Sequence, residues 1–163
     1  MSRRTVSQKK RFVKDSQVEM TQLVLPNDTN QLANLLGGRL MEWMDIAAAV
    51  SAQRHSNRIC VTAAVDNLVF HQPIRLGEVV TLRASVNRAF GTSMEVGVNV
   101  VAENQLTGER KTANTAYLTF VAVDRSTKPV KIPPVIPQSA DEKRRYKEAL
   151  ARRILRLKQR TAN

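Results

Sequence analysis

The chain has 163 residues, of which 42% are hydrophobic and 25% are charged, which excludes a disordered chain and predicts one folded domain with a tail. The single cysteine, Cys60, cannot form an internal disulfide, which fits a reducing compartment. No apolar run approaches the roughly 20 residues that a membrane span requires, and none follows the basic N-terminus as a secretory signal would. We expect a soluble, cytoplasmic protein without integral membrane contact, although the acid-free segment 1–14 leaves a weak mitochondrial presequence open.

The net charge of +12 is concentrated at the two ends of the chain. Residues 1–14 contribute +6, residues 15–124 contribute −3 and residues 125–163 contribute +9. This distribution predicts a basic N-terminal tail, a slightly acidic folded domain over 15–124, and a basic C-terminal region over 125–163. A nucleic-acid-binding domain usually carries its basic patch on the folded face, so we expect no nucleic acid as partner. Basic ends suit any polyanion.

The first half of the domain reads as a strand, a loop and a buried helix. Residues 18–25 alternate loosely and end before Pro26, which indicates a strand. A polar loop over 27–34 leads to a glycine pair, Gly37-Gly38. The following segment, residues 39–51, favours a helix and is apolar on nearly every side, a pattern typical of a buried helix.

Four strand-like runs follow, separated mainly by breaks that contain glycine, as expected for antiparallel neighbours. They span residues 59–70, 79–90, 94–103 and 110–123. In the second run, apolar residues from Val80 to Val86 alternate with polar ones, which predicts one buried face and one solvent-exposed face. One early helix and these strands predict an α+β fold: an antiparallel sheet curled around a central helix, the hotdog architecture.

The C-terminal region consists of a proline-rich linker and a helix. The linker over 124–138 contains four prolines and cannot be helical. Ser139 and Glu142 then form a capping-box signature, which predicts a helix to about Lys158. This helix carries one apolar stripe that could pack on the domain, made of Tyr146, Leu150, Ile154 and Leu157.

Asp45 is the most informative residue, because it lies two turns into the apolar helix and shares a face with Met41, Ala48 and Ala49. A carboxylate in such a helix is costly unless it is paired or hydrogen-bonded. One interpretation is a structural aspartate bonded to the backbone or to an arginine. The other is a catalytic base or nucleophile.

The glycine pair before the helix is a candidate anion site. Glycine permits close approach to the backbone, and the first helical N–H groups lack internal partners, which suits an oxyanion near Gly38. An ordinary tight turn is the alternative. Asn34 precedes the pair, where loop chemistry alone would also explain an asparagine.

Other chemistries find little support. His55 and His71 lack partners at metal-ligand spacing, so we expect no metal and no cofactor. Cys60 has no recognisable base beside it and reads as a buried spectator thiol. Aromatic residues make up only 4% of the chain, which weakens RNA recognition by stacking.

Four stretches in order resemble the acyl-CoA hydrolase branch of hotdog thioesterases, which includes the brain-type cytosolic acyl-CoA hydrolases and bacterial acyl-CoA thioesterases. They are PNDTNQLANLLGGRLMEWMDIAAAVSAQRH, ICVTAAVDNLVFHQPIRLGEVV, NRAFGTSMEVGVNV and TANTAYLTFVAVD, and the tail DEKRRYKEALARRILRLKQR is also similar. The resemblance covers roughly residues 16–160. It implies hydrolysis of a fatty acyl-CoA to a free fatty acid and coenzyme A.

The resemblance also implies site residues. The family's catalytic acid falls on Asp45 and its catalytic asparagine on Asn34, which would orient water or the carbonyl. The residues implied in coenzyme A binding are Ala63, Ala64, Val65, Thr92, Ser93, Met94 and Arg153.

Tandem members of the family divide the aspartate and the asparagine between two repeats, whereas this chain carries both. We therefore expect a homo-oligomer with a dimer as the smallest active unit and a trimer of dimers, a homohexamer, as the full assembly. Three alternatives stay open: a non-hydrolytic acyl-CoA-binding hotdog protein, a dehydratase of the same fold, and a protein that associates with RNA or a membrane through its basic ends.

Overall fold

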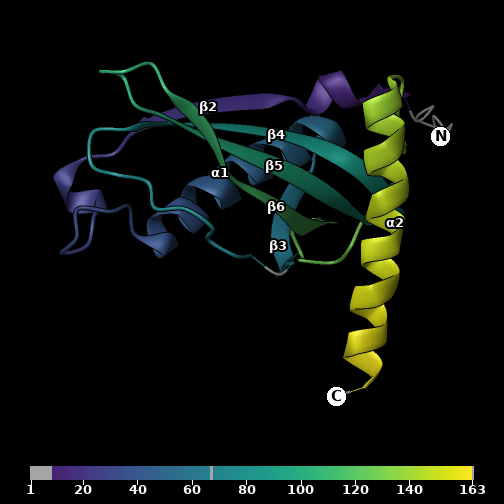
Figure 1. The fold of residues 1–163 in the computed structure, drawn as a ribbon. Helices are drawn as coiled ribbons and strands as arrows, with labels where there is room; N and C mark the ends of the chain where they lie inside the picture. Colours follow the sequence, from purple (N-terminus) through teal and green to yellow (C-terminus); the bar gives the residue numbers. More distant parts are fainter. Residues whose placement is uncertain (1–8, 67, 163) are drawn as a thin grey trace, which may run out of the picture.

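The computed structural model describes residues 9–66 and 68–162 (Figure 1). Part of the predicted basic tail, residues 1–8, lies outside the described residues. The elements in chain order are β1 (Arg11–Phe12), η1 (Val13–Ser16), β2 (Val18–Leu23), η2 (Pro26–Asp28), α1 (Gly37–Ser56), β3 (Ile59–Val65), β4 (Val79–Phe90), β5 (Ser93–Glu103), β6 (Arg110–Val123), β7 (Val135–Ile136) and α2 (Ala140–Thr161).

A five-stranded antiparallel sheet forms the body, with the strand order β2-β4-β5-β6-β3. A two-residue turn at Gly91-Thr92 joins β4 to β5, and the positive φ of 79° at Gly91 is a conformation that glycine adopts without strain. The predicted strands are confirmed. However, β3 ends at Val65 rather than at Phe70, and β2 ends at Leu23 rather than at Leu25.

Helix α1 lies against the inner face of the curled sheet, so the predicted hotdog arrangement is confirmed (Figure 1). Small residues on the helix permit close contact with the sheet, and alternate residues of each strand complete the core. The buried core includes Leu40, Met44, Ala47, Ala48 and Ala52 of α1 and Leu82, Val86, Met94, Val98, Leu118 and Phe120 of the sheet.

Within the single chain, the predicted buried helix α1 is buried on one side only. Met41, Ile46 and Val50 are exposed in the single chain, because the sheet covers only one side of the helix. The helix is also longer than predicted. It continues from Gly37 to Ser56 and ends where Asn57 adopts a left-handed conformation.

Helix α2 crosses the outer face of the sheet, opposite α1 (Figure 1). Its N-terminus has the predicted capping box, in which Ser139 Oγ accepts a hydrogen bond from the Glu142 N–H. The apolar stripe does not pack on the body as a unit, since Leu150, Ile154 and Leu157 are exposed. The side of α2 that contacts the sheet instead carries Ala149, Arg152, Arg153 and Arg156.

The linker and the N-terminal segment support each other, which the sequence did not predict. Strand β1 pairs in parallel with β7, so the linker is not irregular throughout. His55, near the end of α1, is fully buried and donates through Nε2 to the Pro133 carbonyl at 2.7 Å when that nitrogen carries the proton. Burial lowers the pKa of His55, and the Pro133 hydrogen bond opposes this shift.

This lowered pKa generates a prediction for stability. Because the folded protein disfavours the protonated imidazole, the unfolded chain binds the proton first as the pH falls through 6.5. The free energy of unfolding should therefore decrease as the pH falls below that value. His55→Gln keeps a donor for Pro133 but does not titrate, so chemical denaturation at pH 7.5 and pH 5.5 should show a smaller decrease for the variant. An equal decrease in both proteins would contradict this assignment.

Candidate active site

Asp45 lies in the middle of α1, half-buried, on the side that faces β3. The Thr62 hydroxyl on β3 donates a hydrogen bond to Asp45 Oδ1 at 2.6 Å. This bond leaves Oδ2 without a hydrogen-bond donor among the described residues. The neighbouring strand thus supplies the hydrogen bond that a carboxylate in an apolar helix requires.

A cavity of about 340 Å³ opens beside Asp45. Two residues singled out from the sequence, Gly38 and Val65, line it together with Asp45. Its remaining walls are largely apolar and comprise Met41, Glu42, Met44, Thr62, Leu68, Ala116 and Leu118. An apolar cavity beside a carboxylate can hold the hydrocarbon chain of a ligand. The carboxylate can then act as a base on a bond at the end of that chain.

The first turn of α1 is open to a ligand. Leu36, the residue before the helix, provides no side-chain cap. The first N–H groups of the helix are therefore not occupied by a capping side chain. A Cβ atom at Gly38 would have no atom within 4 Å, whereas one at Gly37 would lie 3.3 Å from the Phe70 ring. The backbone at Gly38 therefore faces open space beside the Asp45 cavity and can receive an oxyanion.

Asn34 lies in a different pocket of the same chain. That pocket, of about 290 Å³, is lined by Asn34, Gly37, Phe70 and His71 among others, and it shares no lining residue with the Asp45 cavity. The buried Oδ1 atom of Asn34 has no hydrogen-bond partner within residues 9–66 and 68–162. The structure thus brings Gly38 to Asp45 but does not bring Asn34 to them within one protomer.

Asn30 shapes the loop that carries Asn34. Its side-chain oxygen accepts hydrogen bonds from the N–H groups of Leu32 at 3.0 Å and Asn34 at 3.2 Å. Neither Asn30 nor Thr62 was predicted from the sequence as a site residue. The second was detectable in principle, because it lies beside the predicted binding residues Ala63–Val65 on the strand that follows the helix.

The residues predicted to bind coenzyme A divide into two groups. On the edge strand β3, Ala63 is exposed and Ala64 half-buried. At the β4–β5 turn, Ser93 Oγ accepts a hydrogen bond from Arg153 of α2 at 3.1 Å. The side chain of Met94 is fully buried in the core, so only its backbone is available to a ligand.

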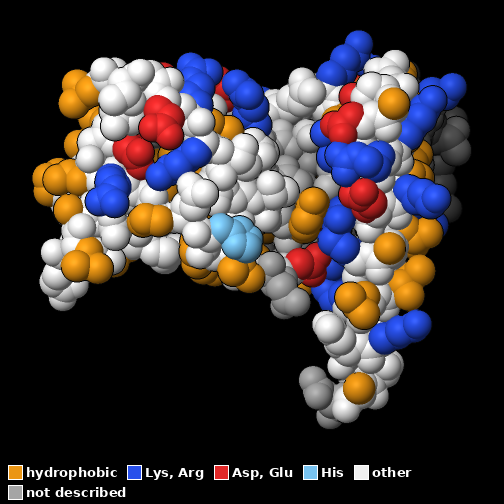
Figure 2. Space-filling view, in the orientation of Figure 1, with side chains coloured by type: hydrophobic (Ala, Val, Ile, Leu, Met, Phe, Trp, Pro, Cys, Tyr) orange, Lys and Arg blue, Asp and Glu red, His pale blue; other side chains and the backbone are white. Residues whose placement is uncertain are grey.

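The sheet separates the two groups within one chain. Asp45 lies on the α1 side, whereas Arg153 belongs to α2 on the outer side, where Lys and Arg side chains gather along the helix (Figure 2). A ligand that reaches both residues must pass the edge formed by β3 or contact two protomers.

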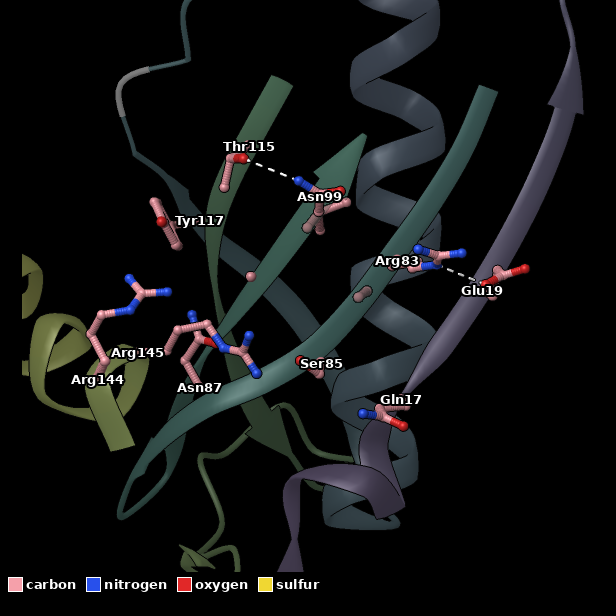
Figure 3. Close-up of a pocket in the computed structure, with 13 residues that line it drawn as sticks. Gln17, Glu19, Arg83, Ser85, Asn87, Asn99, Thr115, Tyr117, Arg144 and Arg145 are labelled. Carbon is pink, nitrogen blue, oxygen red and sulfur yellow. Dashed lines mark hydrogen bonds and ion pairs between the residues drawn. The ribbon is translucent and has the colours of Figure 1, made fainter. Parts of the chain in front are cut away.

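A larger groove, of about 600 Å³, lies on the outer face between the sheet and α2 (Figure 3). It contains three arginines, but each is paired with a carboxylate: Arg83 with Glu19, and Arg144 and Arg145 with Asp141. These pairs leave little free charge for a ligand, and the groove lies on the opposite face of the sheet from Asp45.

Residues 9–66 and 68–162 contain no group of three His, Cys, Asp or Glu side chains arranged to hold a metal ion. Of the helices described, none combines the length and hydropathy needed to cross a membrane.

Known proteins with similar sequences point to one family. Residues 32–109 match the Thioesterase superfamily. The chain is 45% identical over 132 residues to an uncharacterised acyl-CoA thioester hydrolase of Bacillus subtilis, which covers 81% of this chain and 77% of that protein. It is also 40% identical over 153 residues, 94% of its length, to mouse acyl-coenzyme A thioesterase 11, but it spans only 26% of that relative.

Solved structures agree with these relatives. A hexameric acyl-CoA thioesterase superimposes with a TM-score of 0.91 at 40% identity, over 95% of this chain and 99% of that one. The acyl-CoA hydrolase of Staphylococcus aureus, solved with butyryl coenzyme A and coenzyme A, gives 0.85 at 33% identity over 94% and 93% of the two chains. Alanine variants of a threonine, an aspartate and an asparagine of that enzyme have also been solved. The chain belongs to the acyl-CoA thioester hydrolase family of hotdog proteins.

The open space at Gly38 leads to a prediction. Gly38→Ala should not lower the midpoint of thermal unfolding, because the methyl group meets no atom of the chain and alanine favours the helix. The methyl group should nevertheless slow thioester hydrolysis, since it would occupy the space where the carbonyl oxygen must approach the backbone. Unfolding scans and thiol release measure the two effects separately. Unchanged turnover in a stable variant would place the carbonyl elsewhere.

Proposed function

We propose that this chain hydrolyses the thioester bond of fatty acyl-CoA. The observation that carries the proposal is Asp45, hydrogen-bonded by Thr62 at 2.6 Å, at the wall of an apolar cavity that also borders Gly38. The cavity suits the acyl chain or the pantetheine methylene groups, the N–H groups near Gly38 suit the oxyanion, and Asp45 supplies a base or a nucleophile.

As a base, Asp45 takes a proton from water, and the resulting hydroxide attacks the thioester carbonyl carbon. The negative charge on the carbonyl oxygen is stabilised near Gly38. The C–S bond then breaks, and the departing thiolate takes the proton from Asp45, which yields the fatty acid and coenzyme A. As a nucleophile, Asp45 attacks the same carbon and forms an anhydride that water hydrolyses. Both routes require the same carboxylate.

The variants of the S. aureus hydrolase support this choice of residues. In that enzyme the asparagine precedes the aspartate by 15 positions, and the threonine follows it by 17. The same spacing from Asp45 falls on Asn30 and Thr62. We therefore propose that Thr62 orients Asp45, and that the catalytic asparagine is either Asn34, as the sequence motif suggests, or Asn30, as the spacing suggests.

Coenzyme A would bind through its phosphates to the basic helix. Arg153 contacts Ser93, and no carboxylate lies within 4 Å of its guanidinium among the described residues, so its charge is available to an anion. The turn residues Thr92 and Met94 can contribute backbone groups. On the other side of the sheet, Ala63, Ala64 and Val65 would line the path of the pantetheine arm along the edge strand.

An oligomer would join these parts. Strand β3 is an edge of the sheet and carries the exposed residues Ile59, Val61 and Val65. The exposed Met41 of α1 lines the Asp45 cavity. A second copy that pairs along β3 would cover these residues and remove the open edge. We propose a dimer of this kind as the active unit, assembled as a trimer of dimers.

The chemistry at Asp45 is tested by thiol release from acyl-CoA. Asp45→Asn should lower kcat by at least about 100-fold, a usual effect of losing a general base, while the fold survives. Glu42→Gln is a matched control, because Glu42 lines the same cavity but pairs with Arg39. Acyl-CoA binding without thiol release in the wild type would favour the non-hydrolytic alternative. Near-normal turnover of Asp45→Asn would assign Asp45 a structural role.

The shared site is tested by complementation between inactive subunits. Asp45→Ala is mixed, under subunit exchange, with Asn34→Ala and separately with Asn30→Ala. If the aspartate and the asparagine come from different protomers, one site of each mixed dimer is intact and about half of wild-type activity returns. The asparagine variant that is inactive alone and complements Asp45→Ala identifies the catalytic residue. Absence of recovery after proven exchange excludes a shared site.

A further inference from the structure

The most buried charge in the described residues belongs to Glu95 of β5, whose relative exposure is 0%. Its side chain points to the outer face of the sheet and forms a two-point ion pair with Arg152 of α2, at 2.8 and 2.9 Å. Asn87 of β4 donates a third hydrogen bond to the carboxylate at 2.9 Å. A buried carboxylate is tolerated because these donors replace water.

The surrounding residues are arranged to keep this pair in place. Arg152 stacks on the ring of Tyr117, with its guanidinium carbon 3.6 Å from the ring centroid. Asn87 fits because position 97 is a glycine: a Cβ atom there would lie 2.8 Å from Asn87 Nδ2. Tyr117 therefore holds Arg152 from one side, and Gly97 leaves the space that Asn87 needs to reach Glu95.

Helix α2 depends on such polar contacts, because apolar packing contributes little to its position. Ala149 is its only buried residue in the described part of the chain. Its other contacts with the sheet side include the Arg156–Asp66 ion pair at 3.0 Å, the packing of Arg88 on Tyr146 and the hydrogen bond from Arg153 to Ser93. Removing the central ion pair would leave the helix attached mainly at its two flanks.

Arg153 follows Arg152 directly, so the position of one determines the position of the other. Its guanidinium donates to Ser93 Oγ at 3.1 Å and lies 4.5 Å from the Phe90 ring centroid. Whereas Arg152 and Arg156 are neutralised by Glu95 and Asp66, Arg153 has no carboxylate within 4 Å among the described residues. The helix thus presents one uncompensated arginine at the β4–β5 turn.

We infer that Glu95 is a positioning residue for the coenzyme A site, because its buried pair with Arg152 holds α2 where Arg153 and Ser93 can bind a phosphate group together. This inference rests on the proposed function. Loss of positioning and loss of negative charge at Glu95 predict opposite changes in acyl-CoA binding. A carboxylate near a phosphate site repels the ligand, so neutralising Glu95 would by charge alone strengthen binding, whereas loss of its positioning role weakens it.

The test compares two substrates that share an acyl group, one carried by coenzyme A and the other by pantetheine, which lacks the phosphates. Glu95→Gln should raise KM for acyl-CoA about tenfold, since it leaves the half-buried Arg152 without its counter-charge and releases the helix. The kcat for either substrate and the KM for acyl-pantetheine should stay unchanged. A lower or unchanged KM for acyl-CoA would overturn the inference, as would an equal rise for both substrates.

Matched variants control for charge and folding. Glu103→Gln makes the same change on the same strand, at a half-buried carboxylate paired with the exposed Arg110, and Arg144→Gln breaks exposed pairs on α2. Both should retain wild-type KM. Should Glu95→Gln fail to fold, Arg152→Lys keeps the charge but loses the two-point contact, and it should raise KM for acyl-CoA alone by a smaller factor. Unchanged KM in that folded variant would overturn the inference.

The double variant separates this inference from the proposed function. If Glu95 acts through Arg153, adding Glu95→Gln to Arg153→Ala should raise KM for acyl-CoA no further than Arg153→Ala does alone. Independent, multiplying effects would overturn the inference and leave the phosphate contact intact. If Arg153→Ala itself leaves KM unchanged, the assignment of Arg153 to coenzyme A fails, and the positioning role fails with it.

Discussion

The contact between α1 and the inner face of the sheet determines where Asp45 and Gly38 lie. Ala47, Ala48 and Ala52 bring the helix close to the strands, and this closeness allows Thr62 of β3 to reach Asp45. A bulkier helix surface would move the carboxylate away from its only side-chain donor among the described residues. The packing of the core and the chemistry of the site thus depend on the same small residues.

Within one protomer, the candidate site residues lie in separate places. The glycine pair marks the division: Gly38 lines the cavity with Asp45, whereas Gly37 lines the pocket with Asn34. The sheet imposes a second division, because Arg153 lies on its outer face. The edge strand β3 is where an acyl-CoA could pass from one face to the other, and its exposed apolar residues are also the natural contact for a second copy.

The sequence was sufficient for the five strands of the main sheet and for both helices, because these follow from periodicity and capping. It also singled out Asp45 as a candidate, because one carboxylate stands in an apolar helix. It could not reveal β1 and β7, which are two residues each and form only through pairing between distant segments. The neighbouring residues Ala63–Val65 drew attention to the strand that carries Thr62, but the hydrogen bond from Thr62 to Asp45 joins residues 17 positions apart and appears only once the helix packs against that strand. The stripe over 146–157 was misleading because charged side chains, rather than leucines, face the sheet.

That last difference explains the charge distribution of the chain. The C-terminal region carries a charge of +9, but this charge is not spread evenly around a solvated helix. Two acidic residues of the folded domain, whose net charge is −3, form ion pairs with α2 where it meets the sheet: Glu95 pairs with Arg152, and Asp66 pairs with Arg156. Neutralisation at these two points docks a basic helix on the body without large apolar contact. It also leaves Arg153, between them in the sequence, as a half-buried cation, and such a cation attracts a phosphate group more strongly than a solvent-exposed one.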